Sequence, residues 1–293
     1  MRSFDAFAVI DWSGAKSRWH KGIAIAVCET GIAAPVLVAP PERHWTRQAV
    51  LDWLLMQADI RRNILIGLDL STALPFQDKV AYFPGWSKTP ADAKALWRLV
   101  DTMSHLDEHL SATSFIQHPE IARHFRQQRN CGDLFGSGGG RLRHCEASGQ
   151  RKIEGINPYS CFNLVGAAQV GKSSLTGMRV LHQLAGAIPV WPFDKVHTTG
   201  PLILEIYTSI AARASGVLPG GKSKITEDRL LDVALSKFQT TPHTPLAAYN
   251  DHATDAILTA AWLRLHATNP AYWSPPSLTP EIAETEGWTF GVV

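Results

Sequence analysis

The amino-acid sequence predicts an α/β protein, because strand-like apolar runs and helical apolar patterns both occur along its 293 residues. Residues 6–11, 22–27 and 35–39 are predicted strands, and the short links between them favour an antiparallel meander. From residue 46 the apolar side chains follow helical spacing, and residues 64–69 form another apolar run that is typical of a buried strand. The first part of the chain therefore predicts a sheet with a helix packed against it.

Later segments continue this mixture of helices and strands. Helical spacing covers residues 90–110, 174–186 and 226–238. Residues 201–207 form a further apolar run, which carries a glutamate and is predicted to be a buried strand. A last helix is expected from residue 250 to about residue 265, and it is apolar on nearly every side, so we expect it to lie against the sheet.

The domain organisation follows from where these patterns stop. We expect a single domain over residues 1–293, with a long insertion of helices and loops at about residues 76–172. Beyond residue 269 the chain is rich in proline, which predicts an irregular C-terminal strap over about residues 269–293, packed on the surface.

The charge balance excludes a strongly charged protein. The sequence holds 28 Lys and Arg against 26 Asp and Glu, a net charge of +2, so no overall field attracts nucleic acid or a membrane. Any binding of a polyanion requires a local basic patch. Residues 118–152 are one candidate, since they hold seven Lys and Arg against three Asp and Glu.

Composition also bears on location. Hydrophobic residues make up 45% and charged residues 18%, which is ordinary for a soluble globular protein. Four cysteines are too few for a disulfide scaffold. The first residues lack the apolar core of a signal peptide, and no apolar run approaches the length of a membrane span. We therefore expect a cytoplasmic protein that makes no contact with a membrane.

Carboxylates stand at positions where apolar segments end. Asp11 and Asp69 each close a predicted strand, and Glu205 lies in another. Burying a carboxylate costs several kcal/mol unless a partner compensates it, although Asp11 is also able to cap the turn that follows it. Asp251 and Asp255 are four residues apart and therefore share a helical face, where Asp251 also suits the positive end of the helix dipole.

Such carboxylates have a common chemical use. Carboxylates that converge repel one another unless a cation joins them. Hard divalent ions such as Mg²⁺ or Mn²⁺ prefer oxygen ligands of this kind. Two such ions about 3.5–4 Å apart stabilise the attacking and leaving oxygens in phosphodiester cleavage. The carboxylates therefore predict a divalent-metal site.

Four short motifs carry a resemblance to known proteins. They are Val-Ile-Asp-Trp-Ser-Gly-Ala at residues 9–15, Ile-Gly-Leu-Asp-Leu-Ser-Thr-Ala-Leu-Pro at 66–75, Leu-Glu-Ile-Tyr at 204–207 and Asp-His-Ala-Thr-Asp-Ala at 251–256. Together they resemble a bacterial domain-of-unknown-function family of predicted RNase H-like nucleases. The resemblance implies an RNase H-like mixed sheet of three antiparallel strands followed by parallel strands, flanked by helices.

The resemblance also implies roles for individual residues. Asp11 would bridge the metal ions, Asp69 would bind one or both, and Asp255, with Asp251 or His252 nearby, would hold the second. Glu205 would join the catalytic carboxylates or act from outside the ligand set. The implied activity is hydrolysis of nucleic-acid phosphodiester bonds by water, with Mg²⁺ or Mn²⁺ as cofactor and DNA and RNA not distinguished. The expected substrate contacts are Ser13, Lys88, Arg141, Arg143, Lys172 and Lys222.

Other functions fit parts of the same sequence. Residues 166–173 satisfy the phosphate-loop pattern G-x-x-x-x-G-K-S, which is typical of nucleotide-binding ATPases. Residues 11–16 resemble the phosphate loop of sugar kinases and actin-like ATPases. A nucleic-acid-binding module that has the fold without catalysis is the third alternative.

Overall fold

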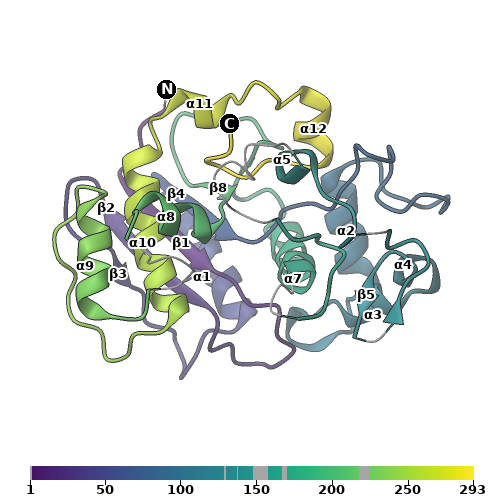
Figure 1. The fold of residues 1–293 in the computed structure, drawn as a ribbon, viewed down its shortest axis with the longest axis horizontal. Helices are drawn as coiled ribbons and strands as arrows, with labels where there is room; N and C mark the ends of the chain where they lie inside the picture. Colours follow the sequence, from purple (N-terminus) through teal and green to yellow (C-terminus); the bar gives the residue numbers. More distant parts are fainter. Residues whose placement is uncertain (1, 129, 137, 148–157, 167–169, 218–224) are drawn as a thin grey trace.

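The computed structural model describes residues 2–128, 130–136, 138–147, 158–166, 170–217 and 225–293. Its centre is a six-stranded sheet with the order β3-β2-β1-β4-β8-β7 (Figure 1). The first three strands are antiparallel neighbours, whereas β1, β4, β8 and β7 run parallel, so the predicted mixed α/β sheet is confirmed. The strands are β1 (Ala6–Asp11), β2 (Ala24–Glu29), β3 (Val36–Leu37), β4 (Ile64–Asp69), β7 (Val190–Trp191) and β8 (Leu202–Glu205).

The edges of the sheet differ most from the sequence-based expectation. The strand predicted at residues 35–39 is only Val36–Leu37, because Pro35 and the Pro40-Pro41 pair have no N–H to donate to a neighbouring strand. At the other edge, β7 was not anticipated, because two residues are too few to give a periodic apolar pattern. The central strands agree closely with the prediction.

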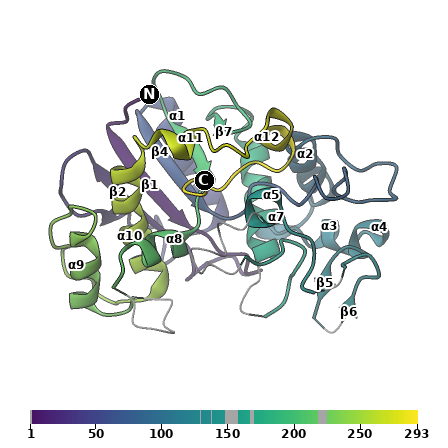
Figure 2. The ribbon, with the colours of Figure 1, turned by 45° about the horizontal axis from the view of Figure 1, so that its top comes forward.

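Helices cover both faces of the sheet (Figure 2). On the first face, α1 (Arg47–Asp59), α2 (Ala93–Met103) and α7 (Val170–Gln183) belong to the hydrophobic core that includes Ile10 of β1 and Leu68 of β4. We call this the α7 face. Thr46 caps α1 and Asp92 caps α2 with side-chain oxygens, which fixes where both helices begin.

The second face is covered by the later helices. Here α8 (Thr208–Ala214), α9 (Asp228–Ser236) and α10 (Asp251–His266) share a core with Val9 of β1 and Leu204 of β8. We call this the α10 face. Since successive strand residues point to opposite faces, every second side chain of β1 lies under α10, and the residues between them lie under α7.

The insertion packs beside the α7 face. Phe83, Phe115 and Phe162 form an edge-to-face aromatic cluster that joins its segments to the core of that face. The insertion contains η1 (Glu108–Leu110), α3 (Thr113–Gln117), α4 (Pro119–Ala122), β5 (Arg126–Gln127), β6 (Asn130–Cys131) and α5 (His144–Ala147). Across the described residues, no helix is long and apolar enough to cross a membrane.

The C-terminal strap is more deeply built into the fold than the sequence suggested. It contains two short helices, α11 (Pro270–Trp273) and α12 (Pro280–Thr285), and its last residues enter the core rather than lying on the surface. Trp288 is 1% exposed and Phe290 is fully buried, and Thr289 between them forms a parallel bridge with Glu205 of β8. The proline content of this segment revealed neither the two short helices nor this burial.

Truncation of Phe290 should therefore destabilise the whole protein. We expect Phe290→Ala to lower the free energy of unfolding by about 3–5 kcal/mol, because it removes a buried ring from the core of the α10 face. Urea denaturation followed by circular dichroism measures this difference. Trp19, which is 47% exposed, provides the control, since Trp19→Ala should have a far smaller effect. Equal losses in the two variants would contradict the buried position of the strap.

Candidate functional site

Asp11 and Asp69 lie side by side at the end of two parallel strands. They are the last residues of β1 and β4, and they are direct partners in the register of these strands. Neighbouring strands are about 4.8 Å apart, and partners in register point to the same face. Both side chains therefore point to the α10 face. They lie at the carboxyl ends of the parallel strands, where ligand sites of α/β proteins occur.

Helix α10 brings further polar groups over this pair. Asn250 caps the helix, and Nδ1 of His252 in its first turn lies 3.1 Å from Oδ2 of Asp11. Asp255 follows His252 by three residues, so it lies on the same side of the helix, and it is buried. Asp251 is more exposed, and its carboxylate is 3.8 Å from Nε2 of His252, on the outer side of that ring.

Thr208 fixes the carboxylate of Asp69 from the start of α8. Its backbone N–H donates to Oδ1 at 3.2 Å, and its hydroxyl donates to Oδ2 at 3.1 Å. Two donors on one carboxylate hold its orientation. The sequence analysis did not single out Thr208. Its position three residues after the end of a predicted strand could have identified it, because proximity to a strand end is also what identified Asp69.

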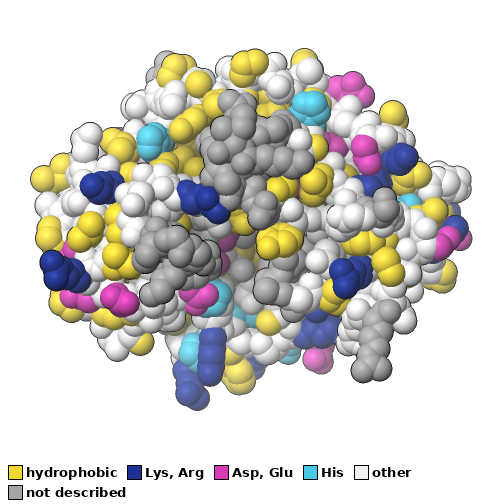
Figure 3. Space-filling model, viewed as in Figure 1, with side chains coloured by type: hydrophobic (Ala, Val, Ile, Leu, Met, Phe, Trp, Pro, Cys, Tyr) yellow, Lys and Arg dark blue, Asp and Glu magenta, His cyan; other side chains and the backbone are white. Residues whose placement is uncertain are grey.

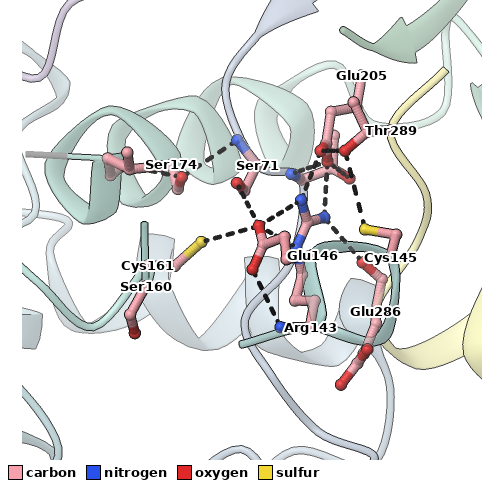
Figure 4. Close-up of polar contacts among 12 residues, drawn as sticks. Ser71, Arg143, Cys145, Glu146, Ser160, Cys161, Ser174, Glu205, Glu286 and Thr289 are labelled. Atoms are coloured by element: carbon pink, nitrogen blue, oxygen red, sulfur yellow. Dashed lines mark hydrogen bonds and ion pairs between the residues drawn. The ribbon is translucent and has the colours of Figure 1, made fainter. Parts of the chain in front are cut away.

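Glu205 leaves the sheet on the face opposite to the aspartates, although it also lines the cavity beside Asp69 that is described below. Its partner in the register of β4 and β8 is Leu68, not Asp69, so its side chain leaves the opposite, α7 face of the sheet. There it accepts hydrogen bonds from Arg143 at 2.5 and 2.8 Å, from the Thr289 hydroxyl at 2.5 Å, and from the N–H and hydroxyl of Thr72 at 2.8 and 2.9 Å. Figure 4 shows this arrangement.

Arg143 is likewise part of the interior rather than a substrate contact. Its side chain is 0% exposed, and it forms ion pairs with Glu205 and Glu146 (Figure 4). Burial alone would raise the pKa of Glu205, but the Arg143 charge and the hydrogen bonds on the carboxylate lower that pKa below its ordinary value. The Arg143 guanidinium is thus engaged by protein carboxylates, and its burial does not support the predicted contact with a substrate phosphate.

Arg141 is also committed to the protein itself. Its guanidinium pairs with Asp78 and donates to the backbone oxygens of Pro75, Ala81 and Tyr82, and only 8% of its side chain is exposed. All of these contacts lie within the insertion and the turn that leads into it. The guanidinium ties this turn together and does not project toward the carboxylates.

The other expected substrate contacts are scattered. Ser13 lines the cavity described below, and Lys172 lies in the first turn of α7. Lys88 is exposed in the loop before α2. Lys222 falls outside the described residues, as does part of the phosphate-loop pattern at residues 166–173. Residues 158–166 contain no strand, whereas a phosphate loop requires one directly before it.

A cavity of about 360 Å³ opens beside Asp69. Ser13 and Ala15, from the loop that follows β1, and Ser173 of α7 line it, and two tyrosines, Tyr159 and Tyr207, complete its wall. Polar groups from strand ends and from the start of a helix thus meet at one opening. This arrangement provides hydrogen-bond donors and acceptors together with aromatic surface for a small group.

The loop after β1 is held by an arginine that the sequence did not single out. Arg47 of α1 is buried and donates to the backbone oxygens of Ser13, Ala15 and His109. Burial lowers the pKa of Arg47 to about 10, helped by the nearby charge of Arg179. Arg47 therefore remains charged at neutral pH and fixes the loop that connects Asp11 to the cavity.

The donor set defines the class of ligand that suits the site. Asp11, Asp69 and Asp255 offer carboxylate oxygens, the donors that Mg²⁺ and Mn²⁺ prefer. Among the described residues, no three His, Cys, Asp or Glu side chains are arranged so that they could hold one metal ion. The site thus consists of two carboxylates that are partners in strand register, with a helix across them that carries a histidine and an aspartate.

Comparisons with known proteins add no assignment. No family model matches the chain, and neither the curated proteins nor the solved structures include a significant match. The fold and the site therefore define the protein as a mixed α/β protein with paired aspartates at the carboxyl ends of two parallel strands.

Proposed function

We propose that this protein is a divalent-metal-dependent phosphodiesterase with an RNase H-like core that hydrolyses nucleic acid. The observation that carries the proposal is the register pairing of Asp11 with Asp69 beneath the first turns of α10. A carboxylate at each of two adjacent strand ends, with a third on the helix above, is a donor set suited to hard divalent cations.

The topology supports the same proposal. The order of elements along the chain agrees with the order that the four sequence motifs imply. It is three antiparallel strands, a helix, a strand ending in aspartate, a long insertion, a later strand and a final aspartate-bearing helix. The helix after β3 covers one face and the last long helix covers the other. The short β7 is an addition at the sheet edge.

The residues have distinct parts in this proposal. Asp11 and Asp69 would hold the cation together with Asp255, and Mg²⁺ or Mn²⁺ bound there would activate water and stabilise charge on the phosphate. Thr208 keeps Asp69 oriented through its two hydrogen bonds. His252 contacts Asp11 and restricts its rotation. The cavity beside Asp69 receives the phosphate group and the sugar or base attached to it.

Titration with Mn²⁺ tests the proposal without requiring a substrate. We expect isothermal titration calorimetry to detect Mn²⁺ binding, and anomalous diffraction from Mn²⁺-soaked crystals to place the ion at Asp11 and Asp69. Loss of a residue that only orients a metal ligand lowers metal affinity by about 10–100-fold. Asp69→Asn removes a ligand itself, so it should lower the affinity for Mn²⁺ by at least ~10-fold.

The exposed Asp59 at the end of α1 provides a matched control. Asp59→Asn makes the same chemical change away from the strand ends and should leave Mn²⁺ affinity unchanged. Absence of Mn²⁺ binding to the wild-type protein would contradict the proposal. Binding of ATP without Mn²⁺ at Asp11 and Asp69 would instead support the nucleotide-binding alternative.

A further inference from the structure

A second cavity lies directly beside the proposed active site. Gly14 packs against the backbone of Lys172 and Ser173, so closely that a Cβ on Gly14 would be 2.5 Å from the Ser173 nitrogen. Ala15 and Ser173 line the cavity next to Asp69, whereas their chain neighbours Lys16 and Lys172 line a second cavity of about 260 Å³. Adjacent residues of the loop after β1 and of the start of α7 thus line the two cavities on either side of this contact.

The lining of the second cavity has a distinct chemistry. Among the described residues that line it, the charged ones are Lys16 and Lys172, and none is a carboxylate. The hydroxyl of Thr113 adds a further polar group. Side-chain amides supply most of the remaining polar surface, from α3 and from the β5–β6 hairpin, at Gln117, Gln127, Gln128 and Asn130.

The two lysines are close enough to affect each other. Burial and the charge of Lys16 both lower the pKa of Lys172. An anion between two ammonium groups relieves their repulsion, so this cavity favours a negatively charged ligand. Elsewhere, Lys and Arg side chains on the face shown in Figure 3 are dispersed among acidic and apolar ones. Because the protein has no strong overall charge, binding of a polyanion requires a local group of basic residues, and Lys16 and Lys172 form such a pair.

Resting on the function proposed above, we infer that this cavity binds a nucleotide of single-stranded nucleic acid adjacent to the one that is cleaved. Lys16 and Lys172 bind its phosphate, and the amide side chains contact the edge of its base. Amides are able to donate to and accept from a base edge. In a single strand the pairing edge of the base is exposed and can be turned into a cavity, whereas in a duplex it is engaged.

Two adjacent cavities also favour a polymer over a small phosphoester. A strand that crosses the Gly14 contact places one phosphate beside Asp69 and another beside the lysines. A mononucleotide occupies only one of the two cavities. The lysine pair thus contributes to binding of the strand and takes no part in the chemical step.

Oligonucleotide binding in EDTA tests this inference separately from catalysis. Fluorescence anisotropy with a labelled 12-nucleotide single strand should show at least ~10-fold weaker binding by the Lys16→Gln/Lys172→Gln variant than by the wild-type protein. Because each phosphate contact on a single strand contributes about 0.7 to the slope of log K against log salt concentration, that slope should fall by about 0.7–1.4. The same strand annealed to its complement should bind more weakly to the wild-type protein.

A charge-matched control separates the cavity from overall charge. Lys79 and Lys237 are exposed and do not line either cavity, so Lys79→Gln/Lys237→Gln should retain wild-type affinity. The inference is overturned if wild-type protein does not bind the strand, if the two double variants lose equal affinity, or if the duplex binds more tightly. EDTA removes metal and hydrolysis from the assay, so failure of the metal-dependent activity leaves this readout intact.

Discussion

Replacement of Asp11 by asparagine should reduce the rate of metal-dependent phosphodiester hydrolysis by at least about 10³-fold. The substitution preserves the size of the side chain but removes the negative charge at the point where β1 and β4 present their carboxylates together. Metal ions stabilise such reactions by several kcal/mol, and a loss of about 4 kcal/mol corresponds to a factor of about 10³ in rate. Asp69→Asn should have an effect of the same order.

Cleavage of a labelled single-stranded oligonucleotide in the presence of Mn²⁺ measures this effect. Asp251→Asn is the matched control, because Asp251 lies in the same helix turn as His252 but is more exposed and outside the strand-end pair. It should lose far less activity than Asp11→Asn. Circular dichroism should show unchanged secondary structure in both variants. If Asp11→Asn retains a rate within a few-fold of wild type, Asp11 is not a catalytic ligand.

The binding-module alternative gives a different pattern. It predicts that wild-type protein binds an oligonucleotide but does not cleave it with either Mg²⁺ or Mn²⁺. The Asp11→Asn variant then differs little from wild type in every assay. The enzyme proposal instead predicts that Asp11→Asn binds the strand in EDTA and fails to cleave it when metal is restored.

The central part of the site could be predicted because it depends on local sequence features. Asp11 and Asp69 each close an apolar run, and the carboxyl ends of parallel strands meet at one edge of a sheet. The helix that carries Asp255 could also be predicted, since apolar residues lie on nearly every side of it. These features need no knowledge of how distant segments align.

Glu205 could not be assigned in the same way because its role depends on register. A shift of one residue in the pairing of β4 with β8 would place it on the face of Asp69. Nothing in the four residues of β8 specifies that alignment by itself. With the observed alignment, Glu205 meets the buried guanidinium of Arg143 on the other face of the sheet. Arg143 lies 62 positions away in the sequence.

The partners of the basic residues could not be predicted for a related reason. A count of Lys and Arg in residues 118–152 identifies charge but not its partners. Arg141 is satisfied by Asp78 and by backbone oxygens, and Arg143 by two glutamates. Conversely, Lys16 stands outside the basic stretch, and only the packing of Gly14 on α7 brings it to Lys172. Partner identity is a property of the tertiary structure.

The ion pair between Arg143 and Glu205 gives the second large expected effect. Arg143→Met should lower the free energy of unfolding by about 3–5 kcal/mol, because it removes one member of a fully buried charge pair and leaves the charge of Glu205 in the interior. Glu205→Gln should cost less than Arg143→Met, since Arg143 still pairs with Glu146 through three hydrogen bonds. Urea denaturation at neutral pH gives both values.

Two further measurements separate the ion pair from simple packing. Arg123→Met removes an arginine that pairs with Asp133 on the surface, and its destabilisation should be far smaller. If Arg123→Met and Arg143→Met lose equal stability, the buried network is not a principal source of stability. In the double variant Arg143→Met/Glu205→Gln no charge remains from this pair, so it should be more stable than the sum of the two single losses predicts.

The pH dependence of stability provides the most specific evidence on this pair. The pKa of Glu205 in the folded protein is below its ordinary value of 4.5, so the unfolded chain takes up a proton there before the folded protein does. The stabilisation from Glu205 is therefore present above about pH 4.5 and is lost as pH falls through the lower, folded-state pKa. Wild-type stability should decline more steeply than that of Glu205→Gln over this acid range. Parallel declines would mean that Arg143 does not hold Glu205 in its charged form.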